Sequence, residues 1–515
     1  MDYYWANQYG HDNFANNIQA VSSDNQDNII CFTHFNTSFT IDETQLNAED
    51  GDDLLVFVVN EDGDTEWYLS DGGLGNQIAQ EVACDNDGNI YLMGKFSGNL
   101  NFGGESFTSN GSFDMYLIKL NTTGELQWVK TFGGPNSESF ESLNIHNGKI
   151  NIVGRYYNFT ILENDTIWGV DGTDFFASQF DLNGNLLQYV TFGGESVDYV
   201  SDVTADNMGN IYIAGDFYQN LQIGEELLEV EDMLGIYLLK LNSNLEVVWL
   251  YQPEGSDLKP GVKISCDSDG NITMAGNFSG NISFDNTQLQ TADFDEDIYV
   301  AYFSSNGDFD WAKRFYSTSM ESVIAFEMDR TGEIYISGHY LNHIHFNEVV
   351  IEYNLCCGDP EIFFVKLDEE GEVLNHSQLT GERSGLQDMH VPEVNQVILT
   401  GQFSEHFQMG DIELNSPTSY NVFLTYYKDD TWLFTENRKS QTDFLLNTVS
   451  NNTFQLTNLP LNAEIQVYNS NGMLIEQISS NHSSLSLGQN WMKGFYLIQI
   501  LPKDTHPIGL KVLKL

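Results

Sequence analysis

Residues Asp85–Gly134 read DNDGNIYLMGKFSGNLNFGGESFTSNGSFDMYLIKLNTTGELQWVKTFGG, and edited copies of this stretch recur along most of the chain. The turn DNDGN opens the apolar run IYLM, which stops at Gly94. A second run, DMYLIKL, turns at Gly124 into LQWV. Short runs of aromatic and β-branched residues between Gly, Asn and Asp are typical of β-strands. The stretch therefore predicts an all-β fold.

Internal repeats are visible as an aromatic residue that returns after 61, 60, 61, 61, 62 and 63 residues. This first series comprises Phe35, Phe96, Tyr156, Phe217, Phe278, Tyr340 and Phe403. A second series keeps the same step and comprises Trp5, Trp67, Trp128, Tyr189, Trp249 and Trp311, before Asn375 replaces the aromatic. A fixed step of this kind is the mark of a repeat architecture, and it indicates seven units.

Each unit contains four apolar runs, which in the second unit predict strands at about 78–84, 89–96, 114–120 and 126–131. Four antiparallel strands per unit fit a β-propeller blade better than a solenoid coil, because a blade packs both of its faces against neighbours. The runs are accordingly apolar rather than strictly alternating. We therefore predict a seven-bladed β-propeller of four-stranded antiparallel blades over residues 1–436.

The phase of the repeat suggests how the ring closes. Residues 5–9 (WANQY) match a fourth strand but precede the first complete set of three. We expect them to complete the last blade, whose own strands run from about Gln387 to Tyr427, and so to remove an open sheet edge. The segment TWLF at 431–434 also resembles a fourth strand, so both alternatives stay open, with the N-terminal one favoured.

The last part of the chain does not continue the repeat. Residues 437–442 are a polar linker, and residues 443–515 contain short runs punctuated by Gly and Asn. This pattern predicts a small separate β-sandwich of the immunoglobulin-like type.

The composition excludes several classes of partner. A formal charge of -55, from 75 acidic and 20 basic residues, repels DNA, RNA and anionic membranes, so no nucleic-acid partner is expected. A hydrophobic content of 41% is too high for a disordered acidic chain. Five scattered cysteines do not form a disulfide framework. Cys84 and Cys266 hold equivalent repeat positions, which favours small buried side chains. The adjacent Cys356 and Cys357 are expected to be free thiols rather than a strained disulfide.

Four repeats carry the pattern D-x-x-G-N-I-Y-x-x-G or a close variant, at 85–94, 206–215, 267–276 and 329–338. This pattern resembles the bacterial β-propeller repeat (SBBP-type) family of secreted proteins. The resemblance covers about residues 1–436. It implies the propeller fold and carries no common enzymatic activity.

The tail resembles the C-terminal sorting domain of type IX secretion cargo through VYNSNGMLI, GFYLIQI and KVLKL. The opening Pro-Asn-Pro of that family is absent, and LNTV stands near its place. The likeness implies recognition by the outer-membrane export machinery, and therefore a secreted or cell-surface protein that crosses the periplasm. The N-terminus MDYYWANQYG is not a signal peptide, so we expect that an N-terminal signal has been removed. The positions that match the sorting signal are Val467, Tyr468, Gly472, Gly494, Tyr496, Lys511, Val512, Lys514 and Leu515.

Two sets of side chains could hold a metal ion. The acidic turns at 85–87, 267–269 and 295–297 supply the oxygen ligands that calcium prefers, but they lack EF-hand spacing, and Asp and Asn also suit tight turns. The structural interpretation is favoured, and no cofactor is expected. His339, His343 and His345 come closest to a transition-metal cluster, although equivalent repeat positions carry ordinary polar residues.

The function predicted from the sequence is binding or adhesion. The Trp series could form a carbohydrate platform, but its strict repeat position favours packing between blades. No catalytic motif for a nucleophile, zinc or phosphate is present, so an enzyme is not expected. The loops that differ between repeats are candidates for recognition of a glycan or surface protein: 41–53, 161–174, 224–235, 285–297 and 347–360. The alternative is an extracellular polysaccharide hydrolase or lyase, which needs two or three acids with raised pKa near the axis. We see no repeat that departs from the template to announce such acids.

Overall fold

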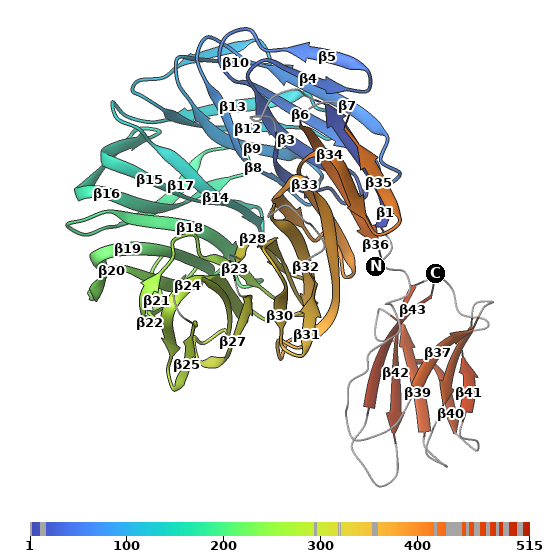
Figure 1. Ribbon diagram of the computed structural model, residues 1–515. Coiled ribbons are helices and arrows are strands. Elements are labelled where there is room, and N and C mark those ends of the chain that lie inside the picture. Colours follow the sequence, from blue (N-terminus) through green and yellow to red (C-terminus); the bar gives the residue numbers. More distant parts are fainter. Residues whose placement is uncertain are drawn as a thin grey trace. The chain divides into compact units, whose positions relative to one another are not determined.

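A computed structural model divides the chain into two units, residues 1–428 and 429–515. The described residues form strands and turns without any helix, and none of them could therefore cross a membrane as a long apolar helix. Figure 1 shows both units. The structure describes residues 3–10, 17–292, 296–317, 319, 321–352, 359–416 and 420–428 of the first unit, and residues 445–449, 453–457, 464–469, 474–479, 484–487, 494–501 and 508–514 of the second.

The second repeat forms one antiparallel sheet in the order β13-β12-β9-β8. Its strands lie within one residue of the predicted ranges, because the apolar runs end at turns that fix the boundaries. Gly88 and Gly124 in those turns have φ values of 78° and 80°, which side-chain-bearing residues rarely adopt. The strands are β8 (Gln77–Cys84), β9 (Ile90–Phe96), β12 (Asp114–Leu120) and β13 (Leu126–Phe132).

Three further sheets repeat this four-stranded order. One contains β2 (Ile18–Ser23), β3 (Ile29–Phe35), β6 (Asp53–Val59) and β7 (Thr65–Asp71). Another contains β14 (Ser139–His146), β15 (Lys149–Leu162), β16 (Asp165–Asp181) and β17 (Leu186–Phe192). The third contains β18 (Asp198–Ala205), β19 (Ile211–Ile223), β20 (Glu226–Leu241) and β21 (Val247–Tyr251).

The next strands join into an eight-stranded sheet along the path β22-β24-β26-β27-β30-β31, with β23 and β25 pairing β24. They are β22 (Glu254–Leu258), β23 (Lys263–Cys266), β24 (Ile272–Phe284), β25 (Thr287–Gln290), β26 (Asp297–Phe303), β27 (Phe309–Ser317), β30 (Ile344–Phe346) and β31 (Val349–Ile351).

A ten-stranded sheet follows the path β28-β29-β32-β33-β34-β36-β1-β4-β5, with β35 pairing β34. The long strand β33 pairs β32 through its first part and β34 through the rest, which joins two consecutive repeats. The strands are β28 (Glu321–Met328), β29 (Ile334–Tyr340), β32 (Glu361–Leu367), β33 (Val373–His390), β34 (Gln396–Met409), β35 (Ile412–Asn415), β36 (Asn421–Lys428), β1 (Tyr3–Gly10), β4 (Ser38–Ile41) and β5 (Thr44–Asn47).

The N-terminal strand pairs with the last repeat, as predicted. β1 runs antiparallel to β36, with register from Tyr3 opposite Tyr427 to Gly10 opposite Asn421. The Thr425 hydroxyl also donates a hydrogen bond of 2.8 Å to the Trp5 carbonyl. The competing segment 431–434 lies outside the described residues. Pairing the two ends of the repeat region gives β36 a partner along its free edge.

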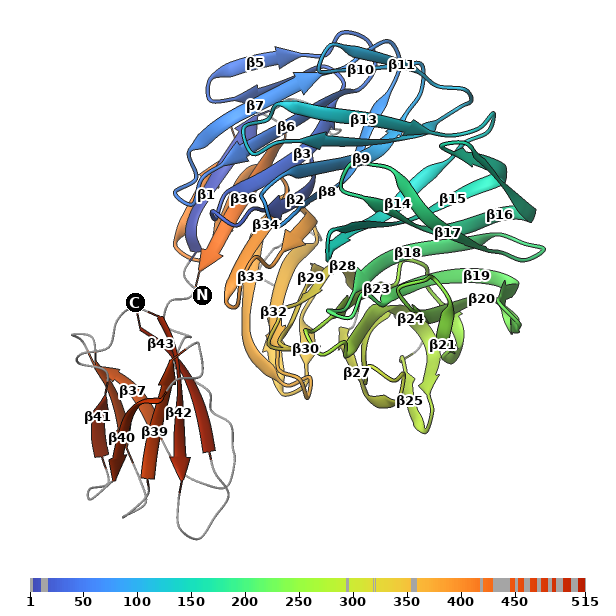
Figure 2. The same cartoon turned by 180° about the vertical axis from the view of Figure 1, so that it is seen from behind.

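The sheets of residues 1–428 are arranged in a ring, as Figures 1 and 2 show from opposite sides. Their inner strands contact one another in the order β2, β8, β14, β18, β23, β28 and β33, and β33 contacts β2 again. The apolar cores lie between neighbouring sheets. One core joins residues of β3, β6, β9 and β12. Both faces of each sheet are therefore buried, which explains the continuous apolar runs.

The variable segments between the second and third strands of each repeat are hairpin ribbons rather than irregular loops. β4 pairs β5, and β10 (Asn99–Phe102) pairs β11 (Glu105–Thr108). In β15 and β16 the ribbon continues the strands themselves. Asp42 and Glu43 at the first ribbon's tip have φ values of 46° and 65°, the left-handed geometry of a two-residue hairpin turn. Such turns are hard to tell from loops in the sequence.

The second unit contains two antiparallel sheets. One has the order β37-β38-β41 and the other β40-β39-β42-β43. Ile465, Val467 and Leu487 are buried. The strands are β37 (Leu445–Val449), β38 (Thr453–Thr457), β39 (Glu464–Asn469), β40 (Leu474–Ser479), β41 (Ser484–Leu487), β42 (Gly494–Leu501) and β43 (Ile508–Lys514).

Candidate functional site

One position of the repeat places charged side chains at the centre of the ring. Inner strands such as β8 contain a β-bulge, for example between Ala79 and Glu81, and a bulge re-aims the side chain that follows it. The residues at this position, which we call the axial column, are Ala20, Glu81, Ser142, Asp202, Lys263, Ala325 and Asp388. Three carboxylates and one lysine therefore replace the apolar residues that an inner strand would otherwise carry.

The acids of the axial column bridge consecutive inner strands. Glu81 Oε2 accepts a hydrogen bond of 2.6 Å from the Leu143 backbone N–H. Asp202 Oδ2 accepts one of 2.9 Å from Ile264 N–H. Asp388 Oδ2 accepts one of 2.9 Å from Val21 N–H, across the junction between the last and first repeats. Since each inner strand has one edge without a neighbouring strand, these carboxylates satisfy donors that would otherwise be unpaired.

The same acids are held in an environment that disfavours their charge. Burial raises the pKa of Glu81 well above its usual value, and the nearby carboxylates of Asp202 and Asp388 add to this effect. Burial also raises the pKa of Asp202, while Lys263 opposes the shift. The pKa of Asp388 rises to about 6, again because of burial. Convergent acids with raised pKa are a property of catalytic and binding sites as well as of structural networks.

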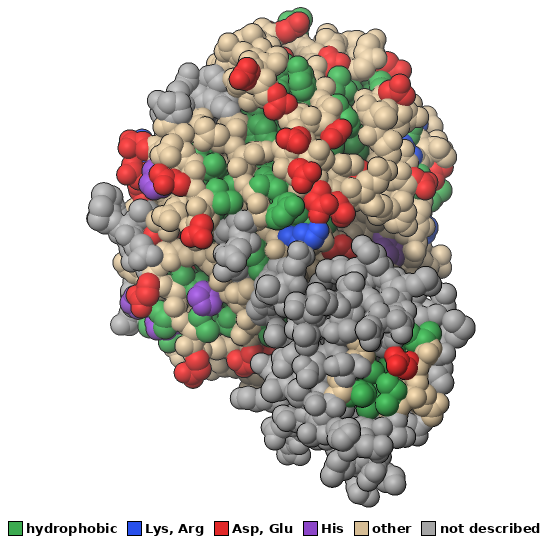
Figure 3. All heavy atoms as spheres, turned by 90° about the vertical axis from the view of Figure 1, so that its right-hand side faces the viewer, with side chains coloured by type: hydrophobic (Ala, Val, Ile, Leu, Met, Phe, Trp, Pro, Cys, Tyr) green, Lys and Arg blue, Asp and Glu red, His purple; other side chains and the backbone are tan. Residues whose placement is uncertain are grey.

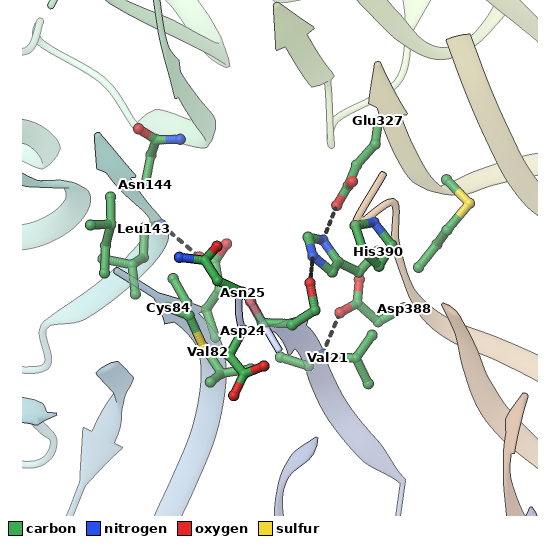
Figure 4. Close-up of a pocket in the computed structure, with 18 of the residues that line it drawn as sticks. Val21, Asp24, Asn25, Val82, Cys84, Leu143, Asn144, Glu327, Asp388 and His390 are labelled. Carbon is green, nitrogen blue, oxygen red and sulfur yellow. Dashed lines mark hydrogen bonds and ion pairs between the residues drawn. The ribbon is translucent and has the colours of Figure 1, made fainter. Parts of the chain in front are cut away.

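A cavity of about 480 Å³ opens above this column. It is formed where the inner strands end, and six carboxylates and one histidine line it without any lysine or arginine. Figure 4 shows His390 between Glu327 and the strand that carries Val21. His390 Nε2 lies 3.0 Å from the Ser23 hydroxyl, and Nδ1 lies 3.2 Å from Glu327 Oε1. Burial alone would lower the pKa of His390, but the Glu327 carboxylate raises it.

We call this cavity the axial pocket, and its lining residues determine which ligands it could hold. Glu327 Oε2 also accepts a hydrogen bond of 2.8 Å from Val391 N–H, so part of its acceptor capacity is already used. Asn144 and Asn25 supply amide groups at the rim. An acidic cavity with amide and imidazole groups favours cationic or hydroxyl-rich ligands and repels anions. Figure 3 shows that Asp and Glu side chains are also dispersed over the outer surface.

The predicted recognition segments lie at the other end of the ring. The axial pocket is formed at the turn between the first and second strands of each repeat, for example at Asp24 and Asn25. Because the strands are antiparallel, the ribbon between the second and third strands projects from the opposite end. The ribbons and the axial pocket are therefore two separate candidate sites.

One ribbon exposes aromatic side chains. In the ribbon of β15 and β16, Phe159 lies opposite Trp168, and their ring centroids are 4.9 Å apart. Trp168 is 70% exposed, Val170 is 71% exposed and Tyr157 is 49% exposed. We call Tyr157, Phe159, Trp168 and Val170 the aromatic ribbon. Trp168 lies in the predicted segment 161–174 and does not belong to the repeated Trp series.

The repeated Trp series packs between repeats, as expected. Trp5, Trp249 and Trp311 donate indole hydrogen bonds to the carbonyls of Glu61, Ser305 and Glu369, at 2.7, 3.3 and 2.9 Å. Trp67 contacts the turn at Gly124, where an added Cβ would lie 2.8 Å from the indole. These rings are therefore engaged with the next repeat rather than offered to a ligand.

The acidic turns act as caps of their own hairpins. Asp85 Oδ1 accepts hydrogen bonds from the Asp87 and Asn89 backbones, and Oδ2 accepts one of 2.9 Å from the Tyr91 hydroxyl. Asp267 repeats this arrangement with the backbones of Asp269 and Asn271. These contacts favour the structural interpretation of the turns. In the third turn, Asp297 pairs with Arg314, and Asp295 lies outside the described residues.

The structure separates the three histidines. His339 Nε2 accepts a hydrogen bond of 2.7 Å from Leu386 N–H, and burial lowers its pKa to about 4. His343 and His345 lie side by side, with ring centroids 5.1 Å apart. His345 also stacks on Tyr316. Within the described residues, no group of three or more His, Cys, Asp or Glu side chains is placed to hold a metal ion.

The cysteines differ in burial. Cys31 is fully buried, whereas Cys84 and Cys266 are partly buried, and all three are free thiols. Cys266 Sγ lies 3.2 Å from the Ala205 carbonyl of the preceding repeat. Cys356 and Cys357 lie outside the described residues.

Most of the predicted sorting positions meet in one sheet of the second unit. Val467 and Tyr468 lie on β39, Gly494 and Tyr496 on the adjacent β42, and Lys511, Val512 and Lys514 on β43. Tyr496 lies opposite Val512, and Gly494 lies opposite Lys514. Gly472 and Leu515 lie outside the described residues.

Sequence reasoning missed the axial acids. The expectation that no repeat departs from the template near the axis was wrong, because Glu81, Asp202 and Asp388 replace the small residues Ala20 and Ala325 of other repeats. The sequence signal that could have revealed these acids is a charged residue within an apolar run, at the same position of several repeats. Only the ring brings these residues together, since Glu81 and Asp202 are 121 positions apart in the chain and Asp202 and Asp388 are 186 apart.

No known family profile matches the chain, and no curated protein sequence resembles it significantly. Among solved structures it is similar to an ulvan lyase described as a new polysaccharide lyase family, at 9% identity and a TM-score of 0.41, over 78% of this chain and 92% of that one. It is also similar to regucalcin, a calcium-binding protein of Agrobacterium tumefaciens, at 10% identity and a TM-score of 0.27, over 65% and 90% of the two chains. PorZ, a surface component of the type-IX secretion system of Porphyromonas gingivalis, matches at 9% identity and a TM-score of 0.13, over 98% and 99%. None of their activities extends to this chain at such similarity.

Proposed function

We propose that the chain is an exported binding module that recognises a neutral glycan of a cell surface or extracellular polymer. The aromatic ribbon carries this proposal, because Trp168 is 70% exposed and is supported by the ring of Phe159. An exposed aromatic face held by a second ring offers flat apolar area at little entropic cost, which suits stacking on a sugar.

The charge of the protein narrows the ligand. A formal charge of -55 disfavours polyanionic polymers, whereas a neutral glycan is not repelled. The ribbon is also one of the segments that differ between repeats, and variable loops on a regular scaffold commonly carry recognition.

A glycan screen of the whole chain tests this function. We expect wild-type binding to at least one neutral polysaccharide, and about five- to tenfold weaker binding by Trp168→Ala, as loss of roughly 1 kcal/mol of ring contact implies. Tyr68→Ala is the matched control, because Tyr68 is an exposed aromatic on β7 away from the ribbon. Equal binding by Trp168→Ala and the wild type would contradict the proposal. Repeating the screen with and without calcium tests the weaker expectation of an ion-dependent ligand.

We infer that residues 1–436 form a seven-bladed β-propeller, followed by a linker at 437–442 and an immunoglobulin-like domain at 443–515. The cyclic contacts of the inner strands and the pairing of β1 with β36 support this inference. In this interpretation β33 supplies the outer strand of one blade and the inner strand of the next.

The second unit would act as a type IX sorting domain that the outer-membrane export machinery recognises, and this would place the protein outside the cell. The gathering of Val467, Tyr496 and Val512 in one sheet supports the view that the matched segments form one folded domain. In a bacterium that carries the system, removal of residues 443–515 should leave the protein in the periplasm. Secretion of the truncated chain at the wild-type level would refute the export proposal without touching the glycan proposal.

A second candidate function is hydrolysis or elimination on a polysaccharide in the axial pocket. The raised pKa values of Glu81 and Asp388 favour it, because a protonated carboxyl group near neutral pH can act as a general acid. Release of reducing or unsaturated ends from any polymer in the screen, abolished in Asp388→Asn and retained in Trp168→Ala, would support the enzyme. Binding without turnover would favour the module.

A further inference from the structure

A second set of buried acids lies at the start of the inner strands, away from the axial pocket. Equivalent positions carry Gln77, Glu138 and Asp198, each at most 1% exposed. Each side chain accepts a hydrogen bond from the backbone N–H four residues earlier. The donors are Gly73 for Gln77 at 3.0 Å, Gly134 for Glu138 at 3.1 Å and Gly194 for Asp198 at 2.6 Å. One oxygen of each side chain is therefore satisfied in the same way.

Gln77 shows what the other end of the side chain requires. Its amide nitrogen Nε2 donates a hydrogen bond of 2.9 Å to the carbonyl of Asn99. That carbonyl belongs to β10, in the ribbon that follows the second strand of the same repeat. A side chain at this position therefore needs a hydrogen-bond donor, because the carbonyl of Asn99 is an acceptor.

Glu138 has the same length as Gln77, so its Oε1 takes the place of the Gln77 N–H donor, whereas Asp198 is one methylene group shorter. Glu138 Oε1 and Asp198 Oδ1 are buried and have no hydrogen-bond partner among the described residues. A Cβ on Gly134 would lie 3.2 Å from the Phe159 carbonyl and 3.4 Å from Glu138 Oε1, so both oxygens border the same small space. Likewise, the Asn220 carbonyl borders Gly194 as the Asn99 carbonyl borders Gly73. Two facing oxygens repel each other unless a proton lies between them.

The charges around these groups also favour a neutral side chain. The ionisable group that faces Glu138 is Asp114, and the one that faces Asp198 is Asp174, both 1% exposed. Neither Glu138 nor Asp198 forms an ion pair with a lysine or arginine in the described part of the chain. Burial, reinforced by the facing aspartates, raises the pKa of each to about 7.

We propose that Glu138 and Asp198 are carboxylic acids in the folded protein, and that each donates its proton to a carbonyl of its own repeat, Phe159 for Glu138 and Asn220 for Asp198. Each acid proton then takes the role that the amide hydrogen has in Gln77. We call the resulting hydrogen bond the proton lock, because it ties the start of an inner strand to the ribbon of the same repeat. The lock opens when the proton is lost, because a carboxylate would then face a carbonyl oxygen and a second carboxylate.

The sign of the pH dependence follows from the direction of the pKa shift. The folded-state pKa of about 7 lies above the value of about 4.3 for an unfolded glutamate. The folded state therefore binds more protons than the unfolded state between these values, so stability is present in full below about pH 4 and falls as the pH rises through 7.

Thermal unfolding of the full chain at pH 5 and pH 8.5 tests the proposal with Glu138→Gln. The amide keeps the bond from Gly134 and supplies a permanent donor. We expect the variant's midpoint to exceed the wild type's by at least about 2 °C at pH 8.5 and to differ little at pH 5. A midpoint lowered equally at both pH values would overturn the proposal.

The reverse variant Gln77→Glu keeps the test decisive if Glu138→Gln folds poorly. It should lower the midpoint at pH 8.5 and leave it nearly unchanged at pH 5, because the new carboxyl group would be protonated only in acid. An equal loss at both pH values would contradict the proton lock. Adding calcium at pH 8.5 separates a proton from a bound cation. If calcium raises the wild-type midpoint and not that of Glu138→Gln, a cation occupies the space and the proposal is wrong.

Discussion

His339 illustrates how one repeat position can be misread as a metal ligand. Its Nε2 accepts the Leu386 N–H, so the ring must be neutral with its proton on Nδ1. Other repeats place a histidine or an asparagine at this position with the same role. His34 Nδ1 accepts the Ala79 N–H at 3.3 Å, and Asn277 Oδ1 accepts the Val323 N–H at 3.1 Å. In three repeats the side chain at this position therefore accepts a backbone N–H of the next repeat, whereas Lys95 and Arg155 hold the same position in two others.

Protonation of His339 should destabilise the fold. Its folded-state pKa of about 4 lies below the unfolded value of about 6.5, so the unfolded state binds more protons between them. Stability is present above pH 6.5 and falls as the pH decreases towards 4, by up to about 3 kcal/mol. Chemical denaturation at pH 7 and pH 4.5 should show that His339→Gln reduces this loss. If NMR shows that the His339 ring takes up its proton with a pKa above 5.5, the assignment is contradicted.

Glu81 offers a paired test of the axial column. Glu81→Gln keeps an acceptor for the Leu143 N–H and removes a buried ionisable group, so we expect equal or greater stability at pH 8. Glu81→Leu leaves that N–H unpaired and should cost about 1–3 kcal/mol. Urea unfolding of the two variants measures the difference. If both variants behave alike, the carboxylate does not cap the strand.

At the scale of elements, β1 determines whether the last sheet has a free edge. Deletion of residues 1–10 would expose the edge of β36 from Asn421 to Tyr427. An unpaired strand edge lowers stability and promotes association between chains. We expect a lower thermal midpoint and a rise in dimers or larger species by light scattering. A monomer with the wild-type midpoint would indicate that another segment, such as 431–434, takes the place of β1.

The ribbons show why elements that look alike in sequence have different roles. β15 and β16 extend without interruption into their ribbon, whereas β9 ends at Phe96 and a separate hairpin of β10 and β11 follows. The extended ribbon projects Trp168 into solvent, while aromatic residues at the repeated positions are covered by the next sheet. The exposure of an aromatic side chain therefore depends on how far its ribbon extends beyond the sheet before it turns.

At the scale of the whole molecule, the two units should unfold independently. Each has its own sheets and buried residues, and the chain divides at residue 428. Deletion of residues 429–515 should therefore leave the main thermal transition within about 2 °C of the full chain. Differential scanning calorimetry of both forms measures this. A large loss of stability would mean that the second unit supports the first.

The sequence by itself determined the strands and their order, and it favoured residues 5–9 over 431–434 as the partner of β36. The apolar runs, the Gly and Asn turns and the step of about 60 residues are local or periodic signals. It also indicated which aromatic residues pack and which acids cap turns. Only the tertiary structure decided what lies at the centre of the ring. Glu81, Asp202 and Asp388 are distant in the chain, and closure brings their side chains together at the axis. The protonation of Glu138 likewise depends on the Phe159 carbonyl and on Asp114, which only the packed junction places beside it, since burial and neighbouring charge rather than residue type set a carboxyl group's state.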